Sequence, residues 1–337
     1  MSKRFTLFCL SLCLAVGLSA QQLPQLNQFQ MNGFMINPAF AGIEDVTDIK
    51  TGFRQQWAGF DGAPMTGWIS AHTNLGKSKE TIPYPGSLPL SDTTLFEKMY
   101  ARGGDKGLRH GLGLNLVYDR LGAFDRVQGQ VAYSFHFPLF KNINMAISPS
   151  VGLSNHGIRT DEVFMFENND ALYDAYMGMG QRFTHLDISA GALIYAPKWW
   201  VGYTAHQLMQ NDIYFGNQPT EAMLDLHHFA MAGVMLPLGR QLELQVNGLF
   251  KLAGDAPYTF DAGARLRWKE LAWFGGGYRH DVAAYAMLGI NITPFISLGY
   301  SYDFPINQIR EGSMGSHEIV LGFRPFNPNR IQNKYLW

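Results

Sequence analysis

The sequence is poor in cysteine and in charged side chains. Its 337 residues include two cysteines, Cys9 and Cys13, both within the first twenty positions. If that segment is removed on export, the mature chain has no thiol. This excludes a disulfide framework, a cysteine nucleophile and a cysteine-ligated metal. Charged residues make up 16% of the chain, below the roughly 25% of ordinary soluble domains.

Long apolar runs are also missing once the first twenty residues are set aside. Residues 1–20 read MSKRFTLFCLSLCLAVGLSA, with Lys3 and Arg4 before an apolar run and small residues at its end. This is the pattern of a secretory signal peptide cleaved after Ala20. Beyond it, no run approaches the roughly 18 apolar residues of a membrane-spanning helix. We therefore expect an exported chain that is periplasmic, secreted or an outer-membrane barrel.

The charge balance gives no sign of a nucleic-acid partner. Without Lys3 and Arg4, the chain carries 24 basic and 27 acidic residues, a net charge of −3. A protein that binds nucleic acid needs a strongly basic face, so we predict that this chain has no nucleic-acid partner.

What the sequence does contain is a repeated alternation of apolar and polar residues. The stretch YTFDAGARLRW, residues 258–268, has an apolar or aromatic residue at every second position and Asp261, Arg265 and Arg267 between them. Side chains alternate faces along a strand, so one face is apolar and the other polar. Segments of roughly ten such residues are typical of transmembrane β-strands. Residues predicted to face lipid are Tyr258, Phe260, Leu266 and Trp268.

About fourteen segments of this kind follow one another along the chain. They begin near residues 47, 66, 110, 126, 143, 184, 199, 227, 241, 258, 271, 283, 295 and 316. An even number of antiparallel strands closes a barrel with both termini on the periplasmic side. The sequence therefore predicts an all-β fold, a transmembrane antiparallel barrel of about 14 strands over residues 47–325. We expect residues 21–46 to lie in the periplasm or to plug the lumen, and residues 326–337 to form a periplasmic tail.

The connections between these segments alternate between short and long. The short set is 138–142, 197–198, 238–240, 269–270 and 292–294, and the long set includes 155–183, 207–226 and 304–315. Outer-membrane barrels have short periplasmic turns and longer outside loops. The link 75–109 departs from this rule, because it is long and polar yet falls on the periplasmic side. Aromatic residues beside the short links predict an interfacial girdle made of Phe137, Trp199, Trp200, Trp268, Trp273 and Phe295.

No stretch carries a convincing catalytic or metal-binding pattern. Ser316, His317 and Glu318 adjoin, but on a strand His317 and Glu318 point to opposite faces and cannot form a relay. Leu321 stands where a zinc HExxH motif needs its second histidine. We predict no catalytic residue, no metal and no cofactor. An outer-membrane hydrolase remains an alternative that no motif supports.

Four stretches, taken together and in order, resemble a known family. They are QLPQLNQFQMNGFMINPAFAG (22–42), FRQQWAGFDGAPMTGWISAH (53–72), GLGLNLVYDRLG (111–122) and YSYDF…GSHEIVLGF (300–323). The chain resembles the PorP/SprF family of outer-membrane proteins of the type IX secretion system, which is also tied to gliding motility. The residues that carry the resemblance, or lie in the matching stretches, are Asn37, Pro38, Ala39, Gly42, Arg54, Gln56, Trp57, Pro64, Asp119, Gly122, Tyr300, Tyr302, Asp303, Ser316, His317 and Glu318.

The resemblance implies a non-enzymatic barrel in the outer membrane, surrounded by lipid, that works with the secretion machinery. Its expected partners are a large secreted surface cargo protein of the adhesin kind and periplasmic ring or peptidoglycan-associated components. The residues themselves leave a passive porin open as a rival, because loops 155–183 and 207–226 can constrict a lumen.

Individual stretches suggest more local roles. The Asn37-Pro38-Ala39 sequence predicts either a structural turn or a turn that docks a partner. We expect Arg54 to pair with a carboxylate in the lumen and Trp57 to anchor at an interface. The predicted partner surfaces are 21–46, 75–109 and the outside loops. Among these, 155–183 is acidic and aromatic, a composition that suits a protein partner.

Overall fold

The structure is a computed structural model of the chain. It describes residues 25–44, 46–76, 108–140, 142–159, 182–215, 218–239, 241–254, 256–269, 271–293 and 295–325. The predicted signal peptide, most of the links 75–109 and 155–183, and the tail 326–337 lie outside the described residues.

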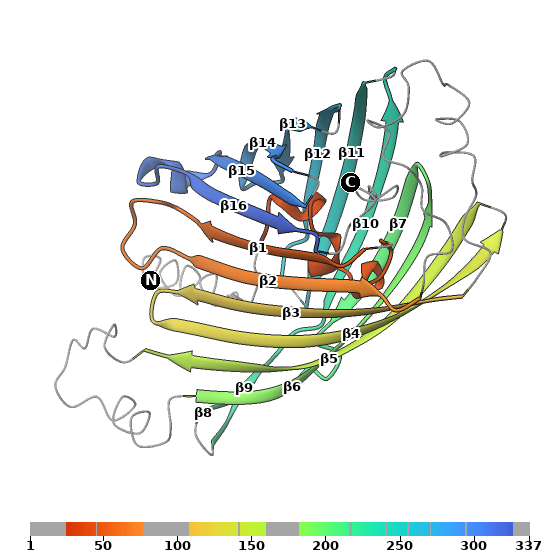
Figure 1. The fold of residues 1–337 in the computed structure, drawn as a ribbon. Helices are drawn as coiled ribbons and strands as arrows, with labels where there is room; N and C mark the ends of the chain where they lie inside the picture. The colour runs from red at the N-terminus through yellow and green to blue at the C-terminus, as the bar shows by residue number, and fades with distance from the viewer. Residues whose placement is uncertain are drawn as a thin grey trace, which may run out of the picture.

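Fourteen strands form a closed barrel in which every strand pairs antiparallel with its neighbours (Figure 1). Their order follows the sequence around the barrel, and β16 pairs with β1 to close it. All fourteen begin within two residues of the predicted positions, which confirms the fold class. The strands are β1 (Asp48–Gln55), β2 (Met65–Asn74), β3 (Arg109–Leu121), β4 (Phe124–Phe140), β5 (Ile143–Ile158), β6 (Arg182–Ala196), β7 (Trp199–His206), β10 (His227–Pro237), β11 (Leu242–Ala253), β12 (Thr259–Trp268), β13 (Ala272–Arg279), β14 (Ala283–Asn291), β15 (Ile296–Pro305) and β16 (Ser316–Phe323).

The remaining elements are short and are not part of the barrel wall. β8 (Asp212–Phe215) and β9 (Gln218–Met223) form a separate two-stranded sheet within the link 207–226. The 3₁₀ helices η1 (Gln28–Gln30), η2 (Gly33–Met35) and η3 (Pro38–Phe40) precede β1, and η6 (Gln308–Glu311) lies between β15 and β16. Within the described residues, no helix combines the length and the apolar character that crossing a membrane requires.

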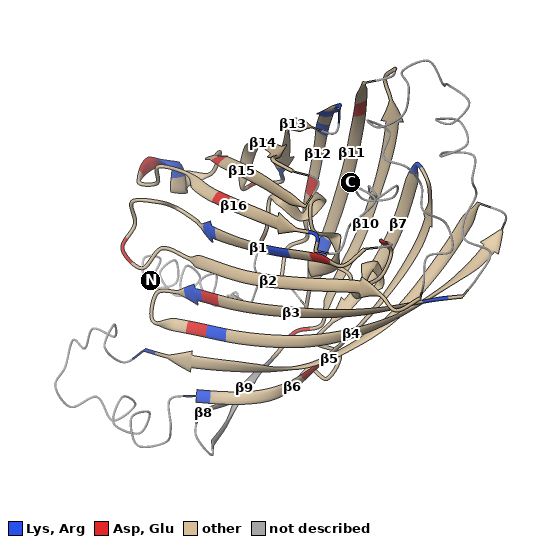
Figure 2. Ribbon diagram, in the orientation of Figure 1, with Lys and Arg blue, Asp and Glu red and all other residues tan. Residues whose placement is uncertain are grey.

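The two faces of the wall meet different surroundings, as the alternation predicts. On β12, Asp261 and Arg265 are 1% and 2% exposed, whereas Trp268 is 44% exposed. On β3, alternate residues from Leu112 to Tyr118 are all more than 40% exposed. In Figure 2 the charged residues of β3 and β4 lie near the strand ends, which leaves an uncharged middle section. This arrangement gives the wall an apolar outer face and a polar inner one.

Two members of the predicted aromatic girdle do not face lipid. Trp199 is 37% exposed, but Trp200 and Trp273 are each 6% exposed and point into the lumen. Adjacent residues on a strand alternate faces, so Trp199 and Trp200 cannot both reach the membrane. Trp200 instead packs edge-on against Phe40 at 5.3 Å between ring centroids, and Trp273 lies 5.6 Å from the guanidinium carbon of Arg265. The prediction was wrong for these two tryptophans.

The two ends of the barrel differ in their connections. One end has the short turns 141–142, 197–198, 238–241, 269–271 and 292–295. We assign it to the periplasm, because short turns occupy that side in bacterial barrels. β2 ends and β3 begins at this same end, so the long link 75–108 departs from it and returns to it. The outer end carries the links 56–64, 122–123, 159–181, 207–226, 254–258, 280–282 and 306–315.

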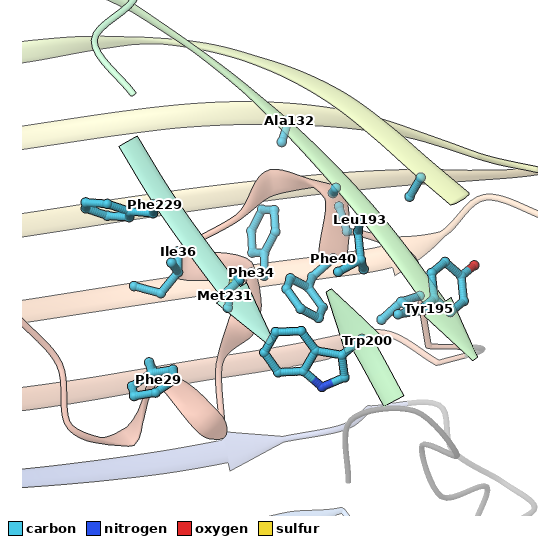
Figure 3. Packing of buried hydrophobic residues seen from close by; sticks show 14 of the residues in the cluster. Phe29, Phe34, Ile36, Phe40, Ala132, Leu193, Tyr195, Trp200, Phe229 and Met231 are labelled. Atoms are coloured by element: carbon cyan, nitrogen blue, oxygen red, sulfur yellow. The ribbon is translucent and has the colours of Figure 1, made fainter. Parts of the chain in front are cut away.

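Residues 25–44, hereafter the lumen segment, lie inside the ring of strands (Figure 1). Phe29, Phe34 and Phe40 of this segment are at most 1% exposed and belong to one apolar cluster with wall residues such as Leu193 and Met231. Figure 3 shows Phe34 and Phe40 close to Trp200, with Phe229 and Phe29 farther to the left in the view. Burial of large aromatic side chains is the main apolar contribution available to such a segment. The core of this protein is therefore the interface between the barrel and its own N-terminal segment.

Candidate functional site in the barrel lumen

The lumen segment is rich in amide side chains as well as aromatic ones. Asn27, Gln28, Gln30, Asn32 and Asn37 are all at most 4% exposed. An amide carries two donors and an acceptor without net charge, and such groups need partners when they are buried. The wall supplies several of these partners from the inward positions of its strands.

Six charged residues form a cluster at the outer half of the lumen, hereafter the outer charge cluster. Arg54 Nη2 lies 2.6 Å from Asp303 Oδ2, and Arg54 Nη1 lies 3.1 Å from Glu318 Oε2. Arg279 Nε and Lys251 Nζ approach Asp261 at 2.6 and 3.1 Å. Three cations thus face three carboxylates, and their formal charges cancel. Buried ions are tolerated only when they are paired in this way.

The outer charge cluster also binds the start of the lumen segment. The Glu318 carboxylate accepts hydrogen bonds from the main-chain N–H groups of Asn27 and Gln28, at 2.7 and 3.0 Å. Arg279 Nη2 donates to the Leu26 carbonyl at 3.3 Å and to Asn27 Oδ1 at 3.1 Å. The Asn27 side chain in turn donates to Asp303. Charged groups give the stronger hydrogen bonds, so this cluster is a strong point of attachment for the segment.

Asn37 attaches the middle of the lumen segment to the opposite wall. Its Oδ1 accepts from the Ala39 N–H at 2.9 Å and so caps η3. Its Nδ2 donates to the carbonyls of Ala192 on β6 and Tyr203 on β7, at 3.0 and 3.2 Å. Asn37, Pro38 and Ala39 are buried, so the geometry is that of a structural turn inside the barrel. A docking partner cannot reach this turn while the segment stays in place.

Glycines on the wall make room for the lumen segment. A Cβ added at Gly113 would collide with the ring of Phe34, and one at Gly111 with the main chain at Ala41. Gly42 has φ +71° and packs against Gly111, a conformation and a close approach that favour glycine. The wall and the segment are therefore shaped to each other.

A second group of charges lies at the periplasmic end of the segment. Asp48 pairs with Lys50 Nζ at 2.7 Å and with Arg324 Nε at 3.2 Å. Glu44 of the lumen segment lies beside them, and burial raises the pKa of its carboxyl to about 8. The negative charge of Asp48 adds to this rise, whereas Lys50 and Arg324 oppose it. Glu44 is therefore largely protonated at neutral pH.

Other family-motif residues lie at the outer rim, where they join neighbouring loops. The Trp57 N–H donates to Ser316 Oγ at 3.2 Å, and the Gln56 N–H donates to the Pro64 carbonyl at 2.9 Å. The Gly122 N–H donates to the carbonyl of Gly62 at 3.0 Å. In addition, Thr66 Oγ1 donates to Asp119 at 2.5 Å. These contacts join the link 56–64 to the link 122–123 and to the start of β16.

The last motif residues lie on the lipid face or at its edge. Tyr300 Oη lies 2.7 Å from His317 Nδ1, and Tyr302 Oη donates to the Met314 carbonyl at 2.6 Å. His317 thus faces outward while its neighbour Glu318 faces the lumen, so the two do not form a catalytic relay. Among the described residues, no group of three or more His, Cys, Asp and Glu side chains could hold a metal ion.

The sequence alone indicated only part of this site. Arg54 and Asp303 lie in the stretches that resemble the family, and Asp261 lies on the polar face of its predicted strand. No sequence motif points to Lys251, Arg279 or Asn27. For Lys251, one feature of the sequence could have predicted a place in this site: it is a charged residue at an inward position of a barrel strand. For Asn27 there is no comparable signal, because its partners are 252 to 291 residues away in the chain.

The chain matches the family model described as type IX secretion system membrane protein PorP/SprF over residues 18–323. Among solved structures it is similar to the outer-membrane protein Omp33 of Acinetobacter baumannii, with 9% identity, a TM-score of 0.46, and coverage of 84% of this chain and 99% of that one. It is also similar to the toluene transporter TbuX of Ralstonia pickettii, with 9% identity, a TM-score of 0.49, and coverage of 87% and 92%. None of the curated proteins compared is similar enough to count as a match. The closed fourteen-stranded barrel and the family match over most of the chain show that this protein is an outer-membrane barrel belonging to the PorP/SprF family of the type IX secretion system.

Proposed function

We propose that this barrel is a non-enzymatic component of type IX secretion and gliding that binds a surface cargo protein and helps to export or anchor it. The observation that carries the proposal is the lumen segment. It lies inside the barrel and is attached at the outer charge cluster and at Asn37, with Glu44 beside Asp48. A barrel occupied by its own chain is suited to present binding surfaces at the membrane.

The same observation counts against a passive porin. Solutes could cross only if Phe29, Phe34 and Phe40 left the lumen, and these rings are among the most deeply buried residues of the described chain. Leaving would also break the hydrogen bonds of Asn27 and Asn37 to the wall. The lumen segment is thus better suited to closing the barrel than to constricting an open one.

We place cargo binding at the outer end, where the link 207–226 carries β8 and β9 and where the acidic, aromatic link 160–181 joins β5 to β6. We place contacts with ring or peptidoglycan-associated components at the periplasmic end, where the link 75–108 and residues 326–337 begin. The expectation that 21–46 is a partner surface does not hold for residues 25–44, because nearly all of them are buried in the lumen.

The test is a mild-detergent purification of the tagged barrel from native outer membranes, with mass spectrometry of the proteins retained. We expect a large secreted surface protein, periplasmic secretion components, or both. A parallel measurement in planar bilayers should show little steady conductance. Recovery of the barrel alone together with a stable open conductance would instead establish the porin.

A further inference from the structure

Arg126 enters the lumen near the outer rim, and two of its donors have no hydrogen-bond partner among the described residues. It is the third residue of β4 and is 9% exposed, and its Nε and Nη2 are buried without any hydrogen bond. Within the part of the chain that the structure describes, it forms no ion pair. Leaving buried donors of a charged group unmet is costly. Such a group therefore calls for an explanation.

The wall beside Arg126 carries a second group that lacks hydrogen bonds among the described residues. His185 on β6 is 7% exposed, and neither of its ring nitrogens has a hydrogen-bond partner. Its ring stacks between Phe183 and His156, with centroid distances of 5.1 Å to each. His156 is also the residue opposite Arg126 in the ladder between β4 and β5. The guanidinium and the imidazole of His185 thus belong to one polar wall of the outer lumen.

Open space lies above the lumen segment, next to the same strand that carries Arg126. Gln128 and Gln130, the next inward residues of β4, line a cavity of about 50 Å³. Leu26, Met35 and Ile36 of the lumen segment line its other side. The lumen segment and β4 therefore border one small cavity, and Arg126 is the next inward residue of β4 toward the outer rim.

The other arginines of the same lumen show which kinds of acceptor a guanidinium binds there. Nε and Nη2 lie on one edge of a guanidinium and can donate hydrogen bonds to a single oxygen atom or to two oxygen atoms of one group. Arg265 uses this edge to hold the amide oxygen of Gln245, at 3.0 and 2.6 Å. Arg279 uses Nη2 to hold the main-chain carbonyl of Leu26. In this barrel, then, that edge binds neutral carbonyl oxygens as well as carboxylates, since Arg279 Nε also donates to Asp261 and Arg54 Nη2 to Asp303.

The surrounding charges favour a neutral partner over an anion. The carboxylates of Asp119 and Asp187 both act on Arg126. Each is held in place by a neighbour, Asp119 by Thr66 at 2.5 Å and Asp187 by Gln128 at 2.5 Å. A phosphate or a further carboxylate would meet two negative charges against one positive charge. A peptide carbonyl carries no such penalty.

We propose that Arg126, with His185 beside it, is a binding site for a main-chain carbonyl of a polypeptide segment that enters the outer mouth of the barrel. The inference rests on the proposed function, since that polypeptide is part of the surface cargo. The barrel would then bind its cargo as it binds its own lumen segment, by an arginine that donates to a main-chain carbonyl. The cargo would approach from the outer side, opposite the lumen segment.

Photo-crosslinking in native outer membranes tests this site in the full-length protein. Phe183 is replaced by p-benzoylphenylalanine, a photoreactive side chain of similar shape, and the adducts are identified by mass spectrometry. The experiment is repeated with Arg126→Gln, Arg126→Lys and Arg182→Gln. Arg182 is the matched control, because it is 49% exposed at the same rim and already pairs with Asp125 at 2.7 Å.

We expect an adduct with the same surface protein that the tagged intact barrel retains. Its yield should fall about tenfold with Arg126→Gln, the loss typical of a hydrogen bond from a charged donor. Arg126→Lys should also reduce the adduct yield, because lysine lacks the planar pair of N–H donors that arginine has. Arg182→Gln should leave the yield unchanged. Barrel assembly is checked by heat-dependent electrophoretic mobility. If Arg126→Gln does not assemble, the adduct yield of Arg126→Lys tests the site instead.

Two results separate this inference from the proposed function. If the intact barrel retains the surface protein but adduct yield is unchanged by the Arg126 variants, or the adducts contain only lipopolysaccharide, the Arg126 site is wrong and the proposed function stands. If the intact barrel retains no surface protein, the proposed function fails and the site fails with it.

Discussion

Arg54 of β1 and Glu318 of β16 stand opposite each other in the ladder that closes the barrel, and Arg54 Nη1 lies 3.1 Å from Glu318 Oε2. The pair joins the first strand to the last across 264 positions of sequence. Glu318 also accepts the main-chain N–H groups of Asn27 and Gln28. One carboxylate therefore contributes both to the closure of the barrel and to the retention of the lumen segment.

Replacing Arg54 by methionine should strongly destabilise the barrel. The change leaves Glu318 and Asp303 buried without their nearest cation, and breaking a buried pair in this way costs about 3–5 kcal/mol. Arg182→Met is the control, because an exposed pair contributes about 0–1 kcal/mol. Thermal unfolding in detergent, followed by loss of the β-sheet circular dichroism signal, measures both. Equal effects for the two variants would show that the outer charge cluster contributes no more than a surface pair.

Asn37→Ala should loosen the lumen segment from β6 and β7. The variant removes the cap on the Ala39 N–H and two hydrogen bonds to wall carbonyls, and we expect a loss of about 1–3 kcal/mol. Asn307 offers a matched comparison, since it also caps a 3₁₀ helix, by accepting from the Ile309 N–H at 3.3 Å, but does so at the rim. Asn307→Ala should cost about 0.5 kcal/mol. Denaturant unfolding of both variants checks the order, and a larger loss at Asn307 would contradict it.

The strands could be located from sequence because the signal for each is local. Period-two alternation and turn residues lie within ten or so positions of one another, so β5, β7 and β16 begin where the sequence places them. The predicted loop 155–183 was too long at both ends, because His156 and Phe183 are paired residues of β5 and β6. Strands that extend beyond the membrane keep their pairing without keeping an apolar face, and the alternation then fades.

The lumen segment could not be placed from sequence for the opposite reason. Its amide side chains fit a soluble periplasmic segment equally well, and the contacts that decide the matter join Asn27 to Glu318 and Asn37 to Ala192. The inward tryptophans were missed on the same grounds. Their position beside short turns predicts membrane anchors, whereas in the structure Trp200 packs against Phe40 and Trp273 against Arg265.

Gly113→Val should displace the lumen segment and open the barrel. A side chain at Gly113 would occupy the position of the Phe34 ring, and overpacking of this kind costs about 1–3 kcal/mol. Gly67 on β2 is the control, because a Cβ added there meets nothing within 4 Å. In planar bilayers we expect the Gly113 variant to conduct more than the parent and Gly67→Val to match the parent. An unchanged conductance at Gly113 would mean that the wall adapts without releasing the segment.

Glu44 should make the barrel less stable as the pH rises. Burial raises its pKa from 4.5 in the unfolded chain to about 8 in the folded one. Between these values the folded state holds a proton that the unfolded state lacks, so stability is full below about pH 4.5 and falls as the pH rises through 8. Glu44→Gln, which cannot ionise, should flatten the dependence of the melting temperature between pH 5 and 9. Glu311→Gln, at an exposed position of η6, should leave it as in the parent; a parent slope that persists in Glu44→Gln would assign the effect elsewhere.

Replacing residues 160–181 by a short glycine-serine linker should weaken cargo retention while the barrel still assembles. The cut must spare residues 155–158 and 182–184, because Asn155, His156 and Gly157 pair with β6 in the barrel wall. The removed stretch is acidic and aromatic, the composition expected of a surface that binds protein. Shortening the link 254–258 by one residue controls for a general disturbance of the rim. Surface cargo recovered with the tagged barrel, normalised to assembled barrel, is the measurement. Undiminished recovery after the long replacement would move the cargo surface to the link 207–226 or to the outer lumen around Arg126.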